Sequence, residues 1–145
     1  MEVNGHKIVV GVDGSEHSDR ALEWAIQEAK LRDARVHVVS VWHVPALVYG
    51  GPGFTPQIET SIDETFKEVA NEAVESAAEK AREAGVDVDI EVEHGQTVDR
   101  LLEAAEDADM LVVGSRGHGG FAGLMLGSVS AQCAHHAPCP LVIVR

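Results

Sequence analysis

The chain has 145 residues, of which 45% are hydrophobic and 24% are charged, an ordinary composition for a globular protein. We expect a single domain over residues 1–145, because this length buries a substantial core without a second module. The 11 Lys and Arg residues against 24 Asp and Glu residues leave a net charge of −13, which argues against nucleic acid as a partner.

The N-terminal stretch MEVNGHKIVVGVDGS has no basic segment followed by an apolar one. No apolar run approaches the roughly 20 residues that a membrane span needs. We therefore predict a cytoplasmic protein with no membrane partner. Two cysteines, Cys133 and Cys139, are too few for a secreted disulfide scaffold. No second ligand pair with zinc spacing accompanies the string CAHHAPC, so structural thiols are favoured over a zinc site.

The first part of the chain alternates between strand and helix patterns. The β-branched run KIVVGV at 7–12 predicts a buried strand that ends at Asp13, and RVHVVSVW at 35–42 predicts a second. Between them, Ala and Leu at helical spacing predict a helix from Ser18 to about Arg32. The stretch 43–59 is rich in proline and glycine, so it cannot be regular throughout.

A long amphipathic helix is predicted over residues 60–84, with Gly85 ending it. Its apolar residues are expected on one side: Ile62, Phe66, Val69, Ala70, Ala73, Val74, Ala77 and Ala81. Its charged outer face is most simply a solvated one, and we assign it no function. The alternating run 86–93 predicts a half-exposed strand toward a sheet edge.

The last elements are shorter. We predict a helix opening at Thr97, a strand over 110–114, a helix over 128–136 and an apolar strand over 141–144. The order βαβαβαβαβ implies a five-stranded parallel sheet of the α/β class, with helices on both faces. Ligands of such sheets bind beyond the carboxyl ends of the strands, where the strand order reverses. The pattern alone leaves the strand order open.

A glycine-rich stretch at 111–130, LVVGSRGHGGFAGLMLGSVS, follows the fourth predicted strand. Its spacing is Gly114, two residues, Gly117, nine residues, Gly127 and then Ser128, where a helix begins. Glycines lack a Cβ, so backbone N–H groups can approach one small anion, and the helix start adds unpaired N–H groups and a positive dipole end. This arrangement indicates phosphate binding.

Two better-known phosphate motifs do not apply. The string GHGGFA at 117–122 matches G-x-G-x-x-G/A, but the position about 20 residues further on falls in the apolar terminal strand instead of on an acidic ribose ligand. The chain also has no G-x-x-x-x-G-K-[ST] sequence, and therefore no Walker lysine.

The pattern Gly-x2-Gly-x9-Gly-(Ser/Thr) resembles the signature of the ATP-binding branch of the universal stress protein family. The resemblance extends from the VVGVDGS opening to the PLVIVR ending. It implies a Rossmann-like domain with the strand order 3-2-1-4-5. That order would bring Asp13 and the 114–130 loop together across a crevice between the first and fourth strands.

The resemblance also implies roles for individual residues around ATP. Asp13 would face the ribose or a phosphate-bound Mg²⁺ (or Mn²⁺), and Val41 and Val113 would border the adenine. The ribose and phosphates would lie on Gly114, Gly117, Gly127, Ser128, Val129 and Ser130. Two alternatives stay open: Asp13 as the turn-former of Asp-Gly-Ser, and Ser130 as a helix cap.

Catalysis has less support than binding. The loop offers only Arg116 and His118 as polar catalytic candidates, and no triad or nucleophile is evident, so we expect little or no turnover. The leading hypothesis is an ATP-binding stress or signalling protein. The alternatives are a slow ATPase or phosphotransferase, and a dimeric interaction protein that binds no nucleotide.

A homodimer is expected through Leu141 to Val144. This apolar terminal strand would be an open edge that a two-fold mate could complete, and the resemblance implies the same dimer. A covering loop within one chain would serve equally well.

Overall fold

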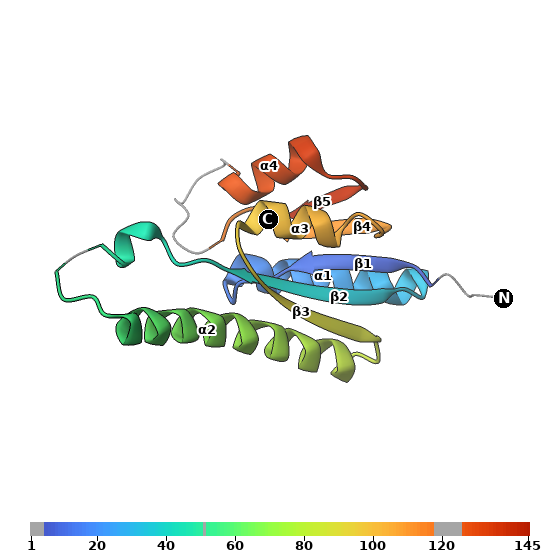
Figure 1. Cartoon of the computed structure of the whole chain (residues 1–145). Helices are drawn as coiled ribbons and strands as arrows, with labels where there is room; N and C mark the ends of the chain where they lie inside the picture. The colour runs from blue at the N-terminus through green and yellow to red at the C-terminus, as the bar shows by residue number, and fades with distance from the viewer. Residues whose placement is uncertain (1–4, 51, 118–125) are drawn as a thin grey trace.

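The computed structural model describes residues 5–50, 52–117 and 126–145 (Figure 1). Five parallel strands form one sheet in the order β3-β2-β1-β4-β5. The strands are β1 (Lys7–Gly11), β2 (Arg35–Trp42), β3 (Val88–His94), β4 (Met110–Gly114) and β5 (Leu141–Val144). The α/β class, the strand order and the edge position predicted for the third strand are therefore confirmed.

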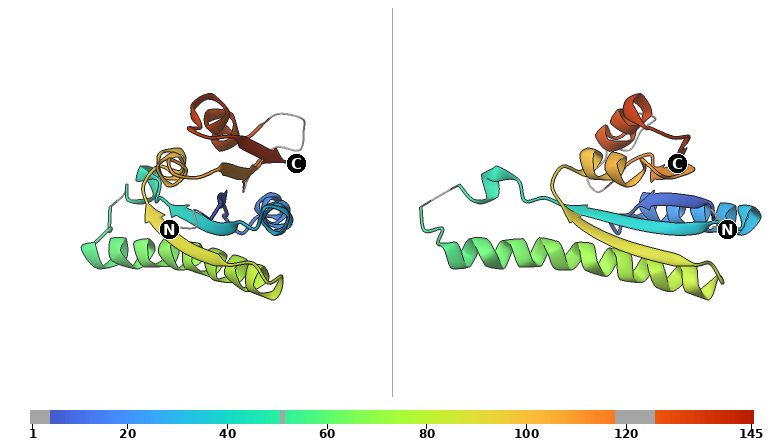
Figure 2. Two further views of the ribbon diagram at one scale, coloured as in Figure 1. Left: turned by 90° about the vertical axis from the view of Figure 1, so that its right-hand side faces the viewer. Right: turned by 45° about the vertical axis from the view of Figure 1, so that its right-hand side comes forward.

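Helices cover both faces of the sheet (Figure 2). They are α1 (Glu16–Arg32), α2 (Pro56–Glu83), α3 (Thr97–Ala104) and α4 (Ser128–His136), with a short 3₁₀ helix η1 (Ala46–Val48) before α2. Alternation along β1 separates the two cores: Ile8 and Val10 pack with α1 and α2, whereas Val9 packs with α3 and α4. No helix among the described residues is both long and apolar enough to cross a membrane.

Capping explains where the helix starts differ from the sequence prediction. α1 begins at Glu16, before the predicted Ser18, because the Ser15 side chain accepts the Ser18 N–H at 3.2 Å. α2 begins at Pro56, before the predicted residue 60, because Thr55 caps it and proline suits the first helical position.

The third strand begins later than predicted. Gly85 has φ +77°, and the N–H of Val86 donates to Ala81 at the end of α2. That N–H is therefore used in helix capping, and the strand starts at Val88 instead of residue 86.

The long helix departs most from expectation. Its buried residues begin only at Ala70 and continue with Val74, Ala77, Ala78 and Ala81. Val69, predicted on the same side, is 55% exposed. The sheet thus covers the second half of α2, while the first half extends past the carboxyl ends of the strands together with η1 (Figures 1 and 2).

The strand order places the crevice. The chain runs β1, β2, β3 toward one edge and then returns to add β4 beside β1 and β5 outside it. Right-handed crossovers in opposite directions leave a gap above the carboxyl ends of β1 and β4. Asp13 follows β1 directly and the glycine loop follows β4, so both lie at this point.

Candidate functional site

A carboxylate from the end of β1 meets the loop that follows β4. The Asp13 Oδ1 atom accepts the N–H of Ser15 at 2.9 Å, which is the turn-forming contact of Asp-Gly-Ser. The other oxygen, Oδ2, lies toward the loop: a Cβ added to Gly117 would be only 2.6 Å from it. Asp13 therefore holds its own turn with one oxygen and faces Gly117 with the other.

Two further loop glycines permit close approach of backbone segments. A Cβ on Gly114 would lie 2.8 Å from the carbonyl oxygen of His17 in the first turn of α1. A Cβ on Gly127 would lie 3.3 Å from the carbonyl oxygen of Ser115. Neither glycine has positive φ. Glycine is therefore needed at both positions because a side chain would not fit, and not because the backbone conformation requires it.

Hydrogen bonds join the two flanks of the loop. The N–H of Gly127 donates to the Ser115 carbonyl at 2.7 Å, and the Ser130 hydroxyl donates to the same oxygen at 2.8 Å. The Ser130 hydroxyl also lies 3.0 Å from the carbonyl oxygen of Gly127, and the residue is 2% exposed. The Ser130 hydroxyl therefore has main-chain partners of the kind the capping alternative expects, and its contact with a nucleotide stays a prediction.

The starts of α1 and α4 both lie at the carboxyl edge of the sheet, but they differ in N-capping and in the charge of the first turn. α1 has the Ser15 side-chain cap and two acidic residues, Glu16 and Asp19, in its first turn. α4 has Gly127 at its N-cap with no side-chain hydrogen bond, and its first turn holds no acidic residue. Within the described residues, no N-cap side chain and no first-turn carboxylate thus compensates the N–H groups and the positive dipole end of α4.

The remaining predicted residues lie around this point. Ser128 is exposed at the first position of α4, and Val129 is half-buried against the α3 and α4 core. Val41 and Val113 lie near the carboxyl ends of β2 and β4 and pack into that same core. All the predicted contacts therefore come from the carboxyl edge or from the α3 and α4 side of the sheet.

A model of the universal stress protein family matches residues 5–145 of the chain. The chain belongs to this family. A universal stress protein of Mycolicibacterium smegmatis is 35% identical over 140 residues, which are 95% of this chain and 47% of that protein. The chain thus spans about half the length of that relative. A Thermus aquaticus universal stress protein is 34% identical over 95% of this chain and 97% of its own length.

Solved structures of universal stress proteins share the fold. UspA from Lactobacillus plantarum superposes with a TM-score of 0.82 at 21% identity, covering 99% of this chain and 100% of that one. A universal stress protein in complex with cAMP gives 0.68 at 29% identity, with 97% of each chain covered. An Arabidopsis thaliana member with AMP bound gives 0.69 at 24% identity, covering 96% of this chain and 90% of that one.

The candidates for catalysis in this universal stress protein remain few. His118 lies outside the described residues, and Arg116 is half-buried and forms no ion pair with any residue in the described ranges. Within those ranges no group of three His, Cys, Asp or Glu side chains could hold a metal by itself. One carboxylate, Asp13, fits a Mg²⁺ that keeps most of its ligands on phosphate and water.

The surroundings of the two cysteine thiols are typical of structural and not of reactive cysteines. Cys133 is buried in the α3 and α4 core, and burial raises its pKa. Burial and the nearby charge of Asp109 raise the pKa of Cys139. Both cysteines are free of disulfide bonds. Because the pKa of each thiol is raised, neither has the thiolate character of a reactive site.

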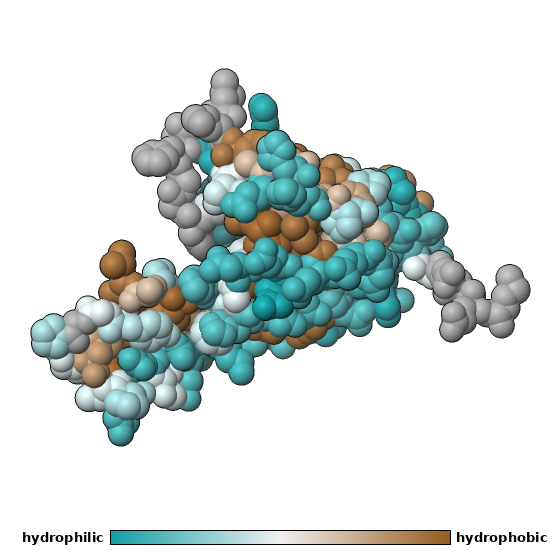
Figure 3. Space-filling model, turned by 45° about the horizontal axis from the view of Figure 1, so that its top comes forward, coloured by the Kyte–Doolittle hydropathy of each residue, from teal (hydrophilic) through white to brown (hydrophobic). Residues whose placement is uncertain are grey.

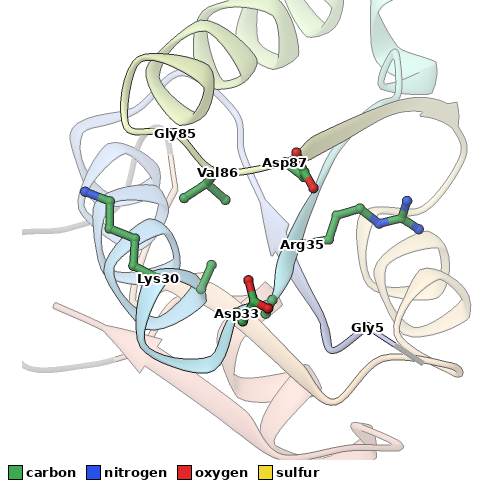
Figure 4. Close-up of a pocket in the computed structure, with 9 residues that line it drawn as sticks. Gly5, Lys30, Asp33, Arg35, Gly85, Val86 and Asp87 are labelled. Atoms are coloured by element: carbon green, nitrogen blue, oxygen red, sulfur yellow. The ribbon is translucent and has the colours of Figure 1, made fainter. Parts of the chain in front are cut away.

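A cavity of about 560 Å³ lies at the opposite, amino edge of the sheet, between the ends of α1 and α2 (Figure 4). Figure 4 shows the side chains of Lys30 and Arg35 extending in opposite directions from it, and Arg35 pairs with Asp89 at 3.2 Å. The polar groups of a binding site converge on one point, whereas those that line this cavity do not. We therefore place the candidate site at the carboxyl edge and not in this cavity.

Sequence reasoning placed Ser18 at a helix start but did not single out Ser15 or Ser115, which are also buried at the crevice. Ser15 caps α1, the Ser18 hydroxyl donates to the Ser15 carbonyl, and Ser115 accepts both bonds from the α4 start. The spacing of Ser15 and Ser18 after Asp-Gly is an N-cap signal that the sequence does contain. Ser115 has no such signal, because its partners are brought to it only by the fold.

Proposed function

We propose that this universal stress protein binds an adenine nucleotide, ATP with Mg²⁺, in the crevice between β1 and β4. The observation that carries the proposal is the start of α4, which has neither a side-chain cap nor an acidic residue and lies beside the Asp13 and Gly117 contact. Bare N–H groups at a positive helix end are suited to phosphate. The bound nucleotide would set a conformation or assembly that is read in a stress or signalling response.

The proposed contacts divide by chemistry. Phosphate oxygens would accept from the backbone N–H groups of Gly117, Ser128 and Val129 and from the exposed Ser128 hydroxyl, with Gly127 leaving space for their approach, while the Asp13 Oδ2 side would take ribose hydroxyls or Mg²⁺. Val41 and Val113 would border the adenine. The family member that binds cAMP, at 29% identity over nearly the whole chain, supports an adenine nucleotide as the ligand.

Little or no turnover is proposed. Hydrolysis requires a positioned base or water-orienting group and preorganised positive charge on the transferred phosphoryl. In the described part of the crevice, Arg116 is the one cationic side chain of the loop. One oxygen of Asp13, the nearby carboxylate that could act as a base, already accepts a hydrogen bond within its own turn. A contaminant-free preparation should therefore hydrolyse ATP well below about 1 per second, the low end of ordinary enzymes.

We also propose a homodimer through β5. This strand is at the edge of the sheet, and no other strand of the described residues pairs with its side away from β4, so that side can accept a further strand. A two-fold mate would supply that strand. Sedimentation at tens of micromolar should give a dimer mass, and a monomer would contradict this assembly.

Two measurements test nucleotide binding. Native mass spectrometry of freshly purified protein should detect a co-purified adenine nucleotide. Calorimetric titration with Mg-ATP should give saturable binding, while adenosine, which lacks phosphates, should bind at least about tenfold more weakly, since hydrogen bonds to charged groups contribute about 1.5–3 kcal/mol each. Equal affinities for ATP and adenosine would contradict a phosphate site.

A further inference from the structure

The first half of α2 is a projecting arm. Residues 56–69 of this helix, together with η1 and the loop between them, extend beyond the carboxyl ends of the strands (Figures 1 and 2). Neither of the two core clusters contains a residue from 43 to 69. The arm is therefore outside the core that holds the rest of the fold together.

An apolar stripe nevertheless continues along this arm. Ile58, Ile62, Phe66 and Val69 are spaced by 4, 4 and 3 residues, so they lie on one side of the helix. Ile58 is 43% exposed and Val69 55%, while Ile62 and Phe66 are half-buried. Figure 3 shows hydrophobic residues gathered on the projecting part of the surface.

The preceding loop adds to this surface without covering it. Leu47 in η1 is 91% exposed and Phe54 is also exposed. The hydroxyl of Tyr49 donates a hydrogen bond to Asp63, which holds the loop against the helix. Four of the seven large hydrophobic side chains that are exposed in the described residues thus lie between positions 47 and 69.

The charges that border the stripe are acidic. At about 100° per residue, Glu59 and Glu68 lie on the two sides of the stripe, whereas Glu64 and Lys67 lie on the opposite face of the helix. Glu59 and Glu68 are exposed, and neither forms an ion pair with a residue in the described ranges. Lys67 is the one Lys or Arg between positions 43 and 69. An apolar stripe bordered by unpaired carboxylates complements a segment with apolar and basic residues on one face.

We propose that the arm of α2 docks a basic amphipathic helix of a partner protein. The partner's apolar face would cover Ile58 and Val69, and its Lys or Arg residues would pair with Glu59 and Glu68. This interaction does not depend on nucleotide binding.

Charge decides against two other occupants. A second copy of this chain would bring the same acidic rows together, at a net charge of −13 per chain. An anionic lipid surface would be repelled for the same reason, since membrane-binding helices carry basic polar faces.

The test uses the full chain and a synthetic peptide as the probe. The peptide is a helix of leucine and lysine, about five turns long, with its leucines on one face; a scrambled peptide of the same composition is its control. Amide chemical shifts recorded during titration should change over residues 56–69. Changes confined to other regions, or equal binding of the scrambled peptide, would overturn the proposal.

Matched variants separate the apolar and charged contributions. Ile58→Ser with Val69→Ser should weaken peptide binding at least about tenfold, since each removes part of a buried aliphatic contact, whereas Leu31→Ser, at an 82% exposed site on α1, should not. The double change of Glu59 and Glu68 to Gln should weaken binding and flatten its salt dependence. The same change at Glu75 and Glu79, exposed on the second half of α2, should do neither.

Other results decide against the proposal. Circular dichroism should match wild type for each variant, because all the changed side chains are exposed. Self-association of wild type that disappears in the Ile58→Ser and Val69→Ser variant would assign the stripe to a second copy. Binding to phosphatidylglycerol vesicles that requires the same two residues would assign it to lipid. Equal weakening by the two Glu→Gln double variants would contradict the role of the bordering carboxylates.

Discussion

α1 and α4 begin at the same edge of the sheet, on opposite sides of the β1 and β4 crevice, yet their first turns are built differently. α1 is closed: Ser15 caps it, and Glu16 and Asp19 offset its positive end. α4 is open, with Gly127 in the cap position and no acidic residue after it. A helix start that is satisfied by its own side chains contributes to stability, whereas one left bare can accept a ligand anion.

This difference makes the start of α4 the better candidate for phosphate, although α1 is nearly twice as long. The two helices contain 9 and 17 residues, but the helix-end charge depends on the first turn and not on length. The cavity at the amino edge is not lined by the first turn of any helix. The chemistry of the first turn, and not the presence of a cavity, therefore selects the candidate site.

The largest effect on Mg-ATP affinity is expected when the first turn of α4 is given an acidic residue, as in α1. Ser128→Asp places a carboxylate in the first turn of α4, which should stabilise the fold by about 0.3–1 kcal/mol through the helix dipole. The same charge should repel the phosphates and reduce Mg-ATP affinity at least about a hundredfold. Urea unfolding and calorimetric titration measure the two effects, which have opposite signs.

Ser128→Asn is the matched control for that change. It has nearly the shape of Asp without the charge, so it should retain most of the affinity. If Ser128→Asp and Ser128→Asn bind Mg-ATP equally, the phosphates do not lie at the start of α4.

A smaller loss is expected when the space between the loop and Asp13 is filled. Gly117→Ala adds a Cβ at 2.6 Å from the Asp13 Oδ2 atom, so the carboxylate or the loop must shift. We expect about a tenfold loss of Mg-ATP affinity, equivalent to about 1.4 kcal/mol. Gly5→Ala, where nothing lies within 4 Å of the new Cβ, should leave affinity unchanged; equal losses in both variants would break this part of the account.

Removing the N-cap of α1 should affect the stability of the fold and not Mg-ATP affinity. Ser15→Ala removes the hydroxyl that accepts the Ser18 N–H, which should lower the free energy of unfolding by about 1 kcal/mol. Mg-ATP affinity should change by less than about twofold, because the acidic first turn of α1 still disfavours phosphate. Chemical denaturation measures the first quantity, and a large loss of affinity in a folded Ser15→Ala protein would implicate α1 in binding.

The smallest effect is expected on the arm, away from both helix starts. The hydrogen bond to Asp63 raises the pKa of Tyr49 to about 12 from about 10. Because the folded-state pKa is raised, this bond stabilises the protein fully below pH 10 and the contribution is lost as the pH rises toward 12. Tyr49 is the one tyrosine of the chain, so ultraviolet absorbance follows it directly; Asp63→Asn should lower its pKa, and an unchanged titration would contradict the contact.

The sequence predicts the local elements better than it predicts what they touch. The bounds of β2, β4, β5 and α4 agree with the predicted ranges, because β-branched runs and the prolines around Cys139 mark them clearly. The strand order came from the family resemblance and not from the pattern, which is the same for any doubly wound sheet.

Contacts between distant segments could not be predicted in the same way. Helical periodicity predicts the apolar side of α2, but it carries no information on how far the sheet extends beneath it, and so Val69 is exposed. The approach of Gly117 to Asp13 joins residues more than a hundred positions apart and requires the folded sheet. The glycine spacing indicated phosphate binding, whereas the bare start of α4 beside the closed start of α1 emerged only from hydrogen-bond geometry.

The most direct test is to compare amide chemical shifts at the two helix starts during titration with Mg-ATP, and then with adenosine. The account predicts that the amides of Ser128 and Val129 shift strongly with Mg-ATP and little with adenosine, while those of Glu16 and His17 stay nearly unchanged. Strong shifts at Glu16 and His17, with Ser128 and Val129 unaffected by Mg-ATP, would contradict it.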